Sequence, residues 1–448
     1  MLTHDQARDR AQALVDRARR AGADSADAVY IADSSESISV RLGKLEDVER
    51  SESEHIGLRV FSGKRSASIG SSDLSDGALA ELAERAIAMA RTAPEDPFSG
   101  LAPDDLLGKA PWPDLDIADP AEPAPAELRH LALAAEDAAR AVTGVTNSDG
   151  AAASAGRAVV ALATSAGFAG SYGGSSHMVS ASVIAGEGGA MQRDSAWSMK
   201  RHGADLDPAE AIGTLAGTRA VARLAPGRLK SGPMTVVFDP RVGNSLLSHL
   251  AGAMNGMTVA RRASFLIGRE DQVLFPAAIR VIDDPLLRRG LRSKPFDGEG
   301  LSTAPRELVR DGRVTGWLMD SAAARQLGAA PTGHAARAAS GAPFVSTSNL
   351  HLAPGAVSRD ELIADIADGV LVTELIGQGV NGITGDYSRG ASGFRIVNGL
   401  IAGPVAEFTI AGNLVDMYAR MAVANDLEFR NSVNAPTIRI EGMTVAGD

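Results

Sequence analysis

The chain has 448 residues, which at about 150 residues per domain corresponds to two or three domains. Hydrophobic residues make up 45% of the sequence and charged residues 22%, a composition typical of a folded globular protein. The formal net charge of −11 argues against a surface that binds nucleic acid. Because the chain contains no cysteine, disulfides, thiolate nucleophiles and cysteine-ligated metal sites are excluded.

Neither a targeting segment nor a membrane span is predicted. The first 20 residues are rich in charged side chains and lack the apolar run that a signal peptide requires. No segment approaches the roughly 18 consecutive apolar residues of a transmembrane helix. We therefore expect a cytoplasmic protein that does not contact a membrane.

Residues 1–93 are predicted to form an α/β module. Its elements in chain order are a helix over 5–21, short strands over 28–32 and 38–42, a hairpin of 57–61 with 65–69, and a helix over 79–90. Both helices show apolar residues at helical spacing, and the Ser62-Gly63 pair supplies the turn of the hairpin.

Residues 94–125 contain eight of the 21 prolines, too many for a regular helix or a central strand, so this segment is predicted to be a linker. A middle α+β module follows over residues 126–228. Its predicted elements are a helix over 128–142, strands over 159–164, 168–172 and 178–185, and a closing helix that ends near Leu224. The sequence Asp207-Pro208-Ala209-Glu210 predicts that the Asp207 carboxylate caps this last helix.

Residues 232–448 are predicted to form a strand-rich C-terminal domain. It begins with an apolar strand over 234–238 and a helix over 240–255. Hairpin turns are predicted at three dipeptides: Asp311-Gly312, Asn398-Gly399 and Glu441-Gly442. The predicted fold class is therefore α+β, with N-terminal α/β modules followed by a strand-rich C-terminal domain that has a mixed or antiparallel sheet.

Two catalytic motifs with strong signals are missing, because neither a G-x-x-x-x-G-K-[ST] loop nor a G-x-S-x-G elbow occurs. The eight histidines are spread so that no two stand at the H-x-x-x-H spacing of a zinc site. His249 lies on the flank of the predicted 240–255 helix, beside an apolar stripe that includes Leu246 and Leu250. For a single histidine in such a place, a structural role is the more common one.

Seven segments nevertheless form a recognisable set. They read GLRVFSGKRSASI (57–69), NSDGAAAS (147–154), TSAGFAGSYGGSSHMVSASVIAGEGGAMQRD (164–194), DLDPAEAIGTLA (205–216), FDGEGLST (296–303), VNGITGDYSRGASGF (380–394) and PVAEFTIAGNL (404–414). Through them the chain resembles the TldD/TldE (PmbA) family of zinc metallopeptidase subunits, from about residue 25 to residue 447. Singly each segment is a glycine-rich loop, and together they are specific.

The resemblance implies where a zinc site would lie. In the catalytic TldD-type subunit a helix carries H-E-x-x-x-H, and a later cysteine supplies the third ligand. The matching positions here are His249, Leu250 and Met254, and the segment 431–434, at the place of the cysteine, reads Asn-Ser-Val-Asn. Peptide hydrolysis by zinc needs three ligands and a general base. The resemblance therefore implies a TldE/PmbA-type subunit with no catalytic residue and no metal of its own.

The resemblance also implies a partner and an activity. The chain would pair, through its strand-rich domain, with a TldD-type catalytic homologue that holds the zinc. This heterodimer would degrade or process unfolded peptides and peptide precursors, and it would not act on nucleic acid. Two alternatives remain open at this point: an independent hydrolase with an unrecognised site, and a homodimeric peptide-binding or scaffold protein.

The segment GITGDYSRG offers Asp386, Tyr387 and Arg389 as candidate contacts to peptide or partner, since it joins an acid, a phenol and a guanidinium in one loop. The alternative is that its glycines shape a tight turn that Asp386 caps. Glu407 is interpreted in the same two ways, as a functional group or as a solvated strand residue.

Overall fold

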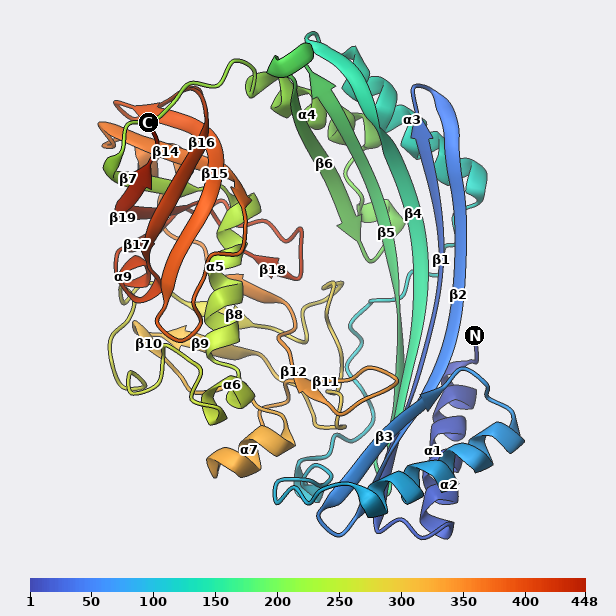
Figure 1. Ribbon diagram of the computed structural model, residues 1–448. Coiled ribbons are helices and arrows are strands. Elements are labelled where there is room, and N and C mark those ends of the chain that lie inside the picture. Colours follow the sequence, from blue (N-terminus) through green and yellow to red (C-terminus); the bar gives the residue numbers. More distant parts are fainter.

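The computed structural model describes residues 1–448 and has two lobes (Figure 1). The N-terminal lobe is built on one antiparallel sheet with the strand order β3-β2-β1-β4-β5-β6. Its strands are β1 (Ser25–Arg41), β2 (Lys44–Ser62), β3 (Arg65–Ser71), β4 (Val145–Thr164), β5 (Ala169–Ala185) and β6 (Gln192–Lys200). Because β1, β2, β4 and β5 are each 17 to 20 residues long, this sheet spans the whole lobe.

Four helices cover one face of this sheet: α1 (His4–Arg20), α2 (Asp76–Thr92), α3 (Pro125–Ala141) and α4 (Ala209–Ala222). The alternation of side chains along β1 explains the arrangement, because Ala28 and Tyr30 pack with α1 and α2 while Ile38 and Val40 pack with α3. Val29 and Ile31 point to the other face, which the C-terminal lobe covers.

The modules 1–93 and 126–228 share this sheet, since β1 pairs with β2 on one side and with β4 on the other. Residues 94–124 between them contain one short 3-10 turn, η1 (Asp104–Leu106). The backbone of this segment bonds to both lobes, from Gly108 N to Gly300 O (2.8 Å) and from Ser175 N to Ile117 O (2.9 Å). Two further 3-10 turns, η2 (Gly188–Ala190) and η3 (Gly203–Asp205), flank β6.

The C-terminal lobe contains a second six-stranded sheet, in the order β16-β15-β14-β7-β19-β17. Its strands are β7 (Gly232–Phe238), β14 (Asp368–Ile376), β15 (Asp386–Val397), β16 (Leu400–Asn413), β17 (Met421–Val423) and β19 (Ile438–Ala446). Strands β7 and β14 are parallel and the other neighbours antiparallel, so the predicted strand-rich domain is confirmed and its sheet is mixed. Strand β16 also pairs with β19, which gives the sheet a barrel-like form.

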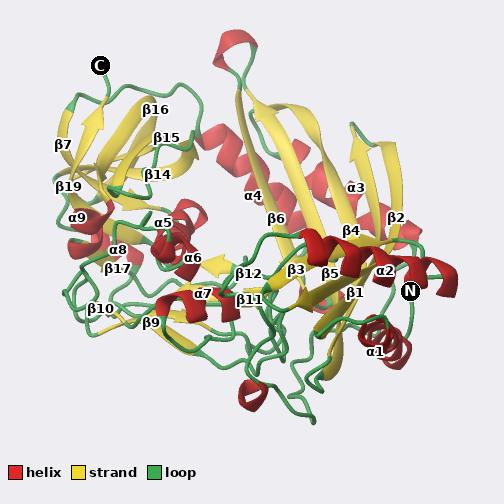
Figure 2. Cartoon of the chain, turned by 60° about the horizontal axis from the view of Figure 1, so that its bottom comes forward, coloured by secondary structure: helices red, strands yellow, loops and turns green.

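The rest of this lobe consists of short elements joined by long loops (Figure 2). A five-stranded sheet has the order β10-β9-β8-β13-β18, and β11 and β12 form a separate hairpin. The strands are β8 (Val281–Asp283), β9 (Arg306–Arg310), β10 (Arg313–Val314), β11 (Ala335–Ala336), β12 (Phe344–Val345), β13 (Leu350–Leu352) and β18 (Val433–Asn434). The helices are α5 (Pro240–Ala253), α6 (Gly256–Ala260), α7 (Ser321–Leu327), α8 (Arg359–Ile363) and α9 (Leu414–Ala419). None of the helices in the chain is long and apolar enough to cross a membrane.

Two of the three predicted hairpin turns are confirmed, at Asp311-Gly312 between β9 and β10 and at Asn398-Gly399 between β15 and β16. The turn predicted at Glu441-Gly442 is wrong. Both residues lie inside β19, at the point where its register with β7 shifts, and Gly442 has φ 67°. The same left-handed backbone that suits a tight turn also suits a β-bulge, so the dipeptide marks a bulge here.

The predicted cap at Asp207 is also wrong. Helix α4 begins at Ala209, Pro208 is its N-cap residue, and no side chain bonds to its first backbone N–H groups. The Asp207 carboxylate instead pairs with Arg430 of the C-terminal lobe at 3.3 Å. The carboxylate that the local sequence pattern predicted as a helix cap therefore forms a long-range ion pair instead.

Candidate functional site

Helix α5 carries the positions that the family resemblance singles out. Asp239 caps the helix by accepting a hydrogen bond from the backbone N–H of Arg241 (3.1 Å), and Pro240 occupies its first turn. Leu250 lies on the buried face and Met254 follows the last turn, and each side chain is only 1% exposed in the 37-residue core of the lobe. Both side chains are therefore part of the hydrophobic core.

His249 lies half-buried at the side of the same helix. Its ring meets the ring of Tyr387 edge-on, with 6.2 Å between the centroids, and its Nε2 atom is buried without a hydrogen-bond partner. Burial lowers the pKa of His249, and the positive charge of Arg389 lowers it further. The imidazole is therefore neutral near pH 7.

The three candidates of the GDYSRG segment lie on strand β15 and divide between its two faces. Tyr387 and Arg389 are buried on the side of His249, and Arg389 donates from Nε to the carbonyl oxygen of Ile376 (3.4 Å). Asp386 is exposed, and it accepts hydrogen bonds from Thr384 Oγ1 (2.7 Å) and Asn413 Nδ2 (3.2 Å). The structure thus brings two of the three candidates to His249 and leaves Asp386 apart.

These residues do not fit a zinc ion. His249 supplies one donor nitrogen, while the alkyl and thioether groups of Leu250 and Met254 cannot replace a general base and a second imidazole. In the segment 431–434, the Asn434 side chain is used within its own turn, accepting from the backbone N–H groups of Arg430 (2.9 Å) and Asn431 (2.8 Å). No group of three or more His, Asp or Glu residues lies close enough to hold a metal ion.

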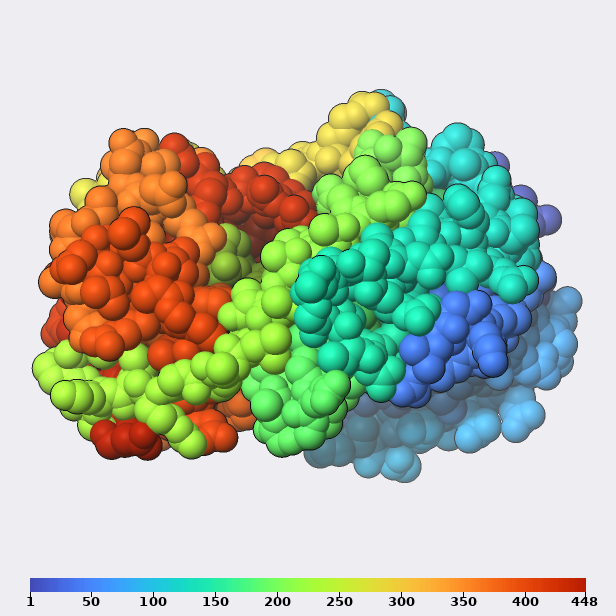
Figure 3. All heavy atoms as spheres, turned by 90° about the horizontal axis from the view of Figure 1, so that it is seen from above, coloured from blue at the N-terminus to red at the C-terminus, as the bar shows by residue number.

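A polar cleft of about 470 Å³ opens beside the first turns of α5, between the two lobes. Strand β6 and helix α4 form one wall, and α5, α8 and the segment 426–435 form the other. Seen from above, the molecular surface is hollowed where the two lobes meet (Figure 3). Four arginines line this cleft: Arg219, Arg241, Arg359 and Arg430.

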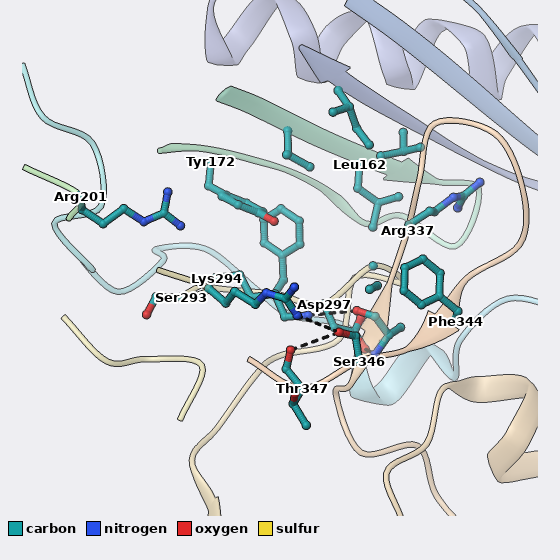
Figure 4. A pocket seen from close by; sticks show the side chains of 18 residues that line it. Leu162, Tyr172, Arg201, Ser293, Lys294, Asp297, Arg337, Phe344, Ser346 and Thr347 are labelled. Atoms are coloured by element: carbon teal, nitrogen blue, oxygen red, sulfur yellow. Dashed lines mark hydrogen bonds between the residues drawn. The ribbon is translucent and has the colours of Figure 1, made fainter. Parts of the chain in front are cut away.

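A second cavity, of about 340 Å³, lies where the C-terminal lobe covers the N-terminal sheet (Figure 4). Lys294 donates from Nζ to the carbonyl oxygen of Ala335 (3.1 Å), and Asp297 accepts from the backbone N–H groups of Glu299, Leu301 and Ala335. Burial lowers the pKa of Lys294 and raises that of Asp297, and the opposite charge of each partially offsets the effect on the other. The Lys294 ammonium and the Asp297 carboxylate are therefore both hydrogen-bonded to backbone groups.

Next to this cavity, four buried charges join the lobes. Arg59 lies directly opposite Asp27 on the neighbouring strand and donates to it at 2.5 Å, while Arg337 of the C-terminal lobe pairs with the other oxygen of Asp27. Glu299, also from the C-terminal lobe, lies 3.7 Å from Arg59. We call these four residues the charged seam.

Sequence reasoning missed the charged seam and the cleft for different reasons. Asp27 and Arg59 interrupt apolar strands, and this pattern could have indicated a buried ion pair. The cleft arginines come from distant helices and loops, and arginines on the polar sides of helices carry no signal of their own.

Comparison with known proteins covers nearly the whole chain. The models for PmbA/TldA metallopeptidase domain 1, central domain and C-terminal domain match residues 26–90, 118–224 and 231–447. The metalloprotease PmbA of Escherichia coli is 37% identical over 92% of this chain and 90% of its own length. The PmbA homologue of Haemophilus influenzae is 35% identical over 97% and 94% of the two chains.

Solved structures agree with this fold. A candidate modulator of DNA gyrase from Bacteroides thetaiotaomicron superposes with a TM-score of 0.92 at 26% identity, covering 100% of both chains. TldE from Thermococcus kodakarensis superposes with a TM-score of 0.88 at 21% identity, covering 98% of this chain and 100% of its own. From its three consecutive domains and its relatives, the chain belongs to the PmbA/TldD metallopeptidase family and is a PmbA-type member of it.

Proposed function

We propose that this chain is the non-catalytic subunit of a heterodimeric zinc metallopeptidase of the TldD/TldE type. Its partner is a homologue with an intact H-E-x-x-x-H helix, which holds the zinc. The substrates are unfolded peptides and peptide precursors. Within the complex, this chain completes the enclosure around the partner's site and contributes to the binding of peptide.

One observation carries this proposal: on the helix that would bear the metal site, two of the three motif positions are packed in the hydrophobic core. Leu250 and Met254 are each 1% exposed, and His249 faces Tyr387 and the charge of Arg389. A cation at His249 would therefore meet a guanidinium in place of a carboxylate. Membership of a metallopeptidase family without a donor set for the metal favours a supporting subunit over an independent hydrolase.

The test compares this chain alone, an H-E-x-x-x-H homologue alone, and the two expressed together. We expect the two chains to elute as one complex in size-exclusion chromatography, with zinc at one equivalent per partner chain and none per copy of this chain. Peptide cleavage that a chelator abolishes should require the partner. Separate elution at micromolar concentration, or chelator-sensitive cleavage by the pure single chain, would contradict the proposal.

A further inference from the structure

The polar cleft beside α5 contains two arginines that lack an acidic partner. Arg219 on α4 makes one side-chain hydrogen bond, from Nη1 to the carbonyl oxygen of Ser195 (3.2 Å). Arg359 on α8 lines the same cleft, and neither guanidinium lies within 4.0 Å of a carboxylate. The chain itself therefore pairs neither charge directly.

The acidic side chains of the cleft are already engaged. Two of them form ion pairs, Asp194 with Arg241 (3.2 Å) and Glu428 with Arg430 (2.6 Å). The other two accept hydrogen bonds, Asp239 from the backbone N–H of Arg241 (3.1 Å) and Asp426 from Thr437 Oγ1 (2.7 Å). A rearrangement that paired Arg219 with one of them would break an existing interaction.

Arg219 is also partly withdrawn from water. Burial lowers the pKa of this guanidinium and the neighbouring charge of Arg241 lowers it further, while the more distant Asp194 and Asp239 offset only part of this effect. A partly buried guanidinium gains more interaction free energy from an added anion than an arginine on an open surface does, because water screens the interaction less. The planar fork of a guanidinium matches the two oxygens of a carboxylate.

The remaining lining of the cleft suits a peptide. Trp197 and Leu215 offer apolar surface, while the Ser195 hydroxyl and the Asn431 amide line the cleft without a side-chain hydrogen-bond partner in the chain. These groups can pair with peptide N–H and C=O groups, and the volume of about 470 Å³ is within the range of ligand sites.

We infer that this cleft binds a carboxylate of a peptide, through Arg219 and Arg359. The inference rests on the proposed function, because that function makes peptides the substrate class, and it assigns part of their recognition to this chain. The carboxylate comes from the C-terminus of the peptide or from an acidic side chain, and the experiment distinguishes these two sources.

The experiment measures the binding of fluorescent peptides to the full chain by anisotropy, and then to its complex with the partner. Three peptides share one neutral sequence: a free acid, a C-terminal amide, and an amide with one internal glutamate. We expect the free acid or the glutamate peptide to bind roughly 10-fold tighter than the neutral amide, as for a charge-assisted pair. The tighter of the two identifies the source of the carboxylate.

Two variants and one control assign the effect to the cleft. Arg219→Gln and Arg359→Gln should each remove most of the preference while binding of the neutral amide stays the same. Arg20→Gln is the matched control, because Arg20 is an exposed arginine on α1 without a side-chain partner and lies outside the cleft. This control should keep the full preference.

Three results would overturn the inference: equal binding of all three peptides, a preference that survives both cleft variants, or no binding to chain or complex at millimolar peptide. Stronger competition by inorganic phosphate than by acetate would also overturn it, in favour of a phosphate site. The subunit role is judged separately, by zinc content and partner-dependent cleavage, so failure of one proposal is distinguishable from failure of the other.

Discussion

The two lobes meet in two different ways. At the charged seam, the side chains of Asp27, Arg59, Arg337 and Glu299 are each at most 8% exposed, and each charge has an opposite charge within 4.0 Å. The β11–β12 hairpin covers the same region, where the carbonyl oxygen of Ala339 touches the backbone at Gly57. At the polar cleft, by contrast, ion pairs such as Arg241 with Asp194 (3.2 Å) also join the lobes, but an open space remains between them and two arginines have no acidic partner.

This difference separates a region built for stability from a region available for binding. Buried charges that are fully matched fix the relative position of two surfaces, because removing one leaves another unpaired in a medium of low polarity. Charges left unmatched beside an open space add little to stability and remain available to a ligand. We therefore expect variants at the seam to affect folding and variants at the cleft to affect binding.

The largest effect is expected from Asp27→Ala. Loss of this carboxylate leaves Arg337 buried with no acidic group within 4.0 Å and Arg59 with Glu299 alone within that distance, and it should lower the free energy of unfolding by about 3 to 5 kcal/mol. Urea unfolding measures the change. Asp33→Ala, at an exposed position on the same strand, is the control, and an equal loss in both variants would contradict the role of the seam.

The seam also predicts a dependence on pH. Burial alone would raise the pKa of Asp27, but Arg337 and Arg59 outweigh it and hold this pKa below its ordinary value. A depressed pKa gives stabilisation that is complete above the unfolded value, about 4, and is lost as the pH falls through the folded value. The difference in free energy of unfolding between the wild type and Asp27→Asn should therefore shrink below about pH 4. A difference that grows with acid would be inconsistent with this account.

Helix α5 joins the polar cleft to the hydrophobic core of the C-terminal lobe, since its first turns line the cleft and its last turn lies in the core. Restoring the family motif with Leu250→Glu and Met254→His should lower the free energy of unfolding by about 2 to 4 kcal/mol, because it places polar groups in packed apolar surroundings. We expect no stoichiometric zinc in this double variant, since the third ligand is still missing. Near-stoichiometric zinc with chelator-sensitive peptide cleavage would show that a working site had been present.

A smaller effect is expected where the β11–β12 hairpin contacts strand β2 of the N-terminal sheet. An added Cβ at Gly57 would lie 1.5 Å from the carbonyl oxygen of Ala339, so Gly57→Ala must displace the hairpin and should cost about 1 to 3 kcal/mol. Gly77→Ala is the matched control, because nothing lies within 4 Å of a Cβ there and alanine favours its helix. Thermal unfolding of both variants should show opposite shifts.

The smallest effect on stability is expected at the cleft. Arg219→Gln and Arg359→Gln should change the free energy of unfolding by less than about 0.5 kcal/mol, since neither arginine forms an ion pair. Urea unfolding of the two variants checks this expectation. A loss of the size seen for Asp27→Ala would mean that the cleft is a second structural seam.

Local patterns predicted most of the elements but not their full lengths. The helices at residues 4–20 and 76–92 and the hairpin of β2 with β3 follow directly from spacing and turn residues. The 20-residue strand β4 was predicted only at its apolar end, because its first half is rich in Ala, Ser and Gly. Pairing with β1 and β5 along its whole length holds that half extended, and no local pattern encodes such pairing.

The candidate site was predictable only where the family motif could be compared position by position. His249, Leu250 and Met254 were found in this way, and α5 lies close to the predicted helix. Tyr387 and Arg389 were singled out by residue type, and their approach to His249 depends on the packing of β15 against α5. Arg219 and Arg359 are 140 residues apart, and only the tertiary fold brings them to one cleft.

The most direct test of the central claim uses the complex of this chain with an H-E-x-x-x-H partner whose glutamate is replaced by glutamine. With the wild-type partner, the complex should cleave an unfolded peptide, and a chelator should abolish this cleavage. With the substituted partner, the complex should still assemble and bind peptide, but cleavage should fall to the level of a blank. Cleavage at a rate comparable to that of the wild-type complex would contradict the account, because the chemistry would then reside in this chain.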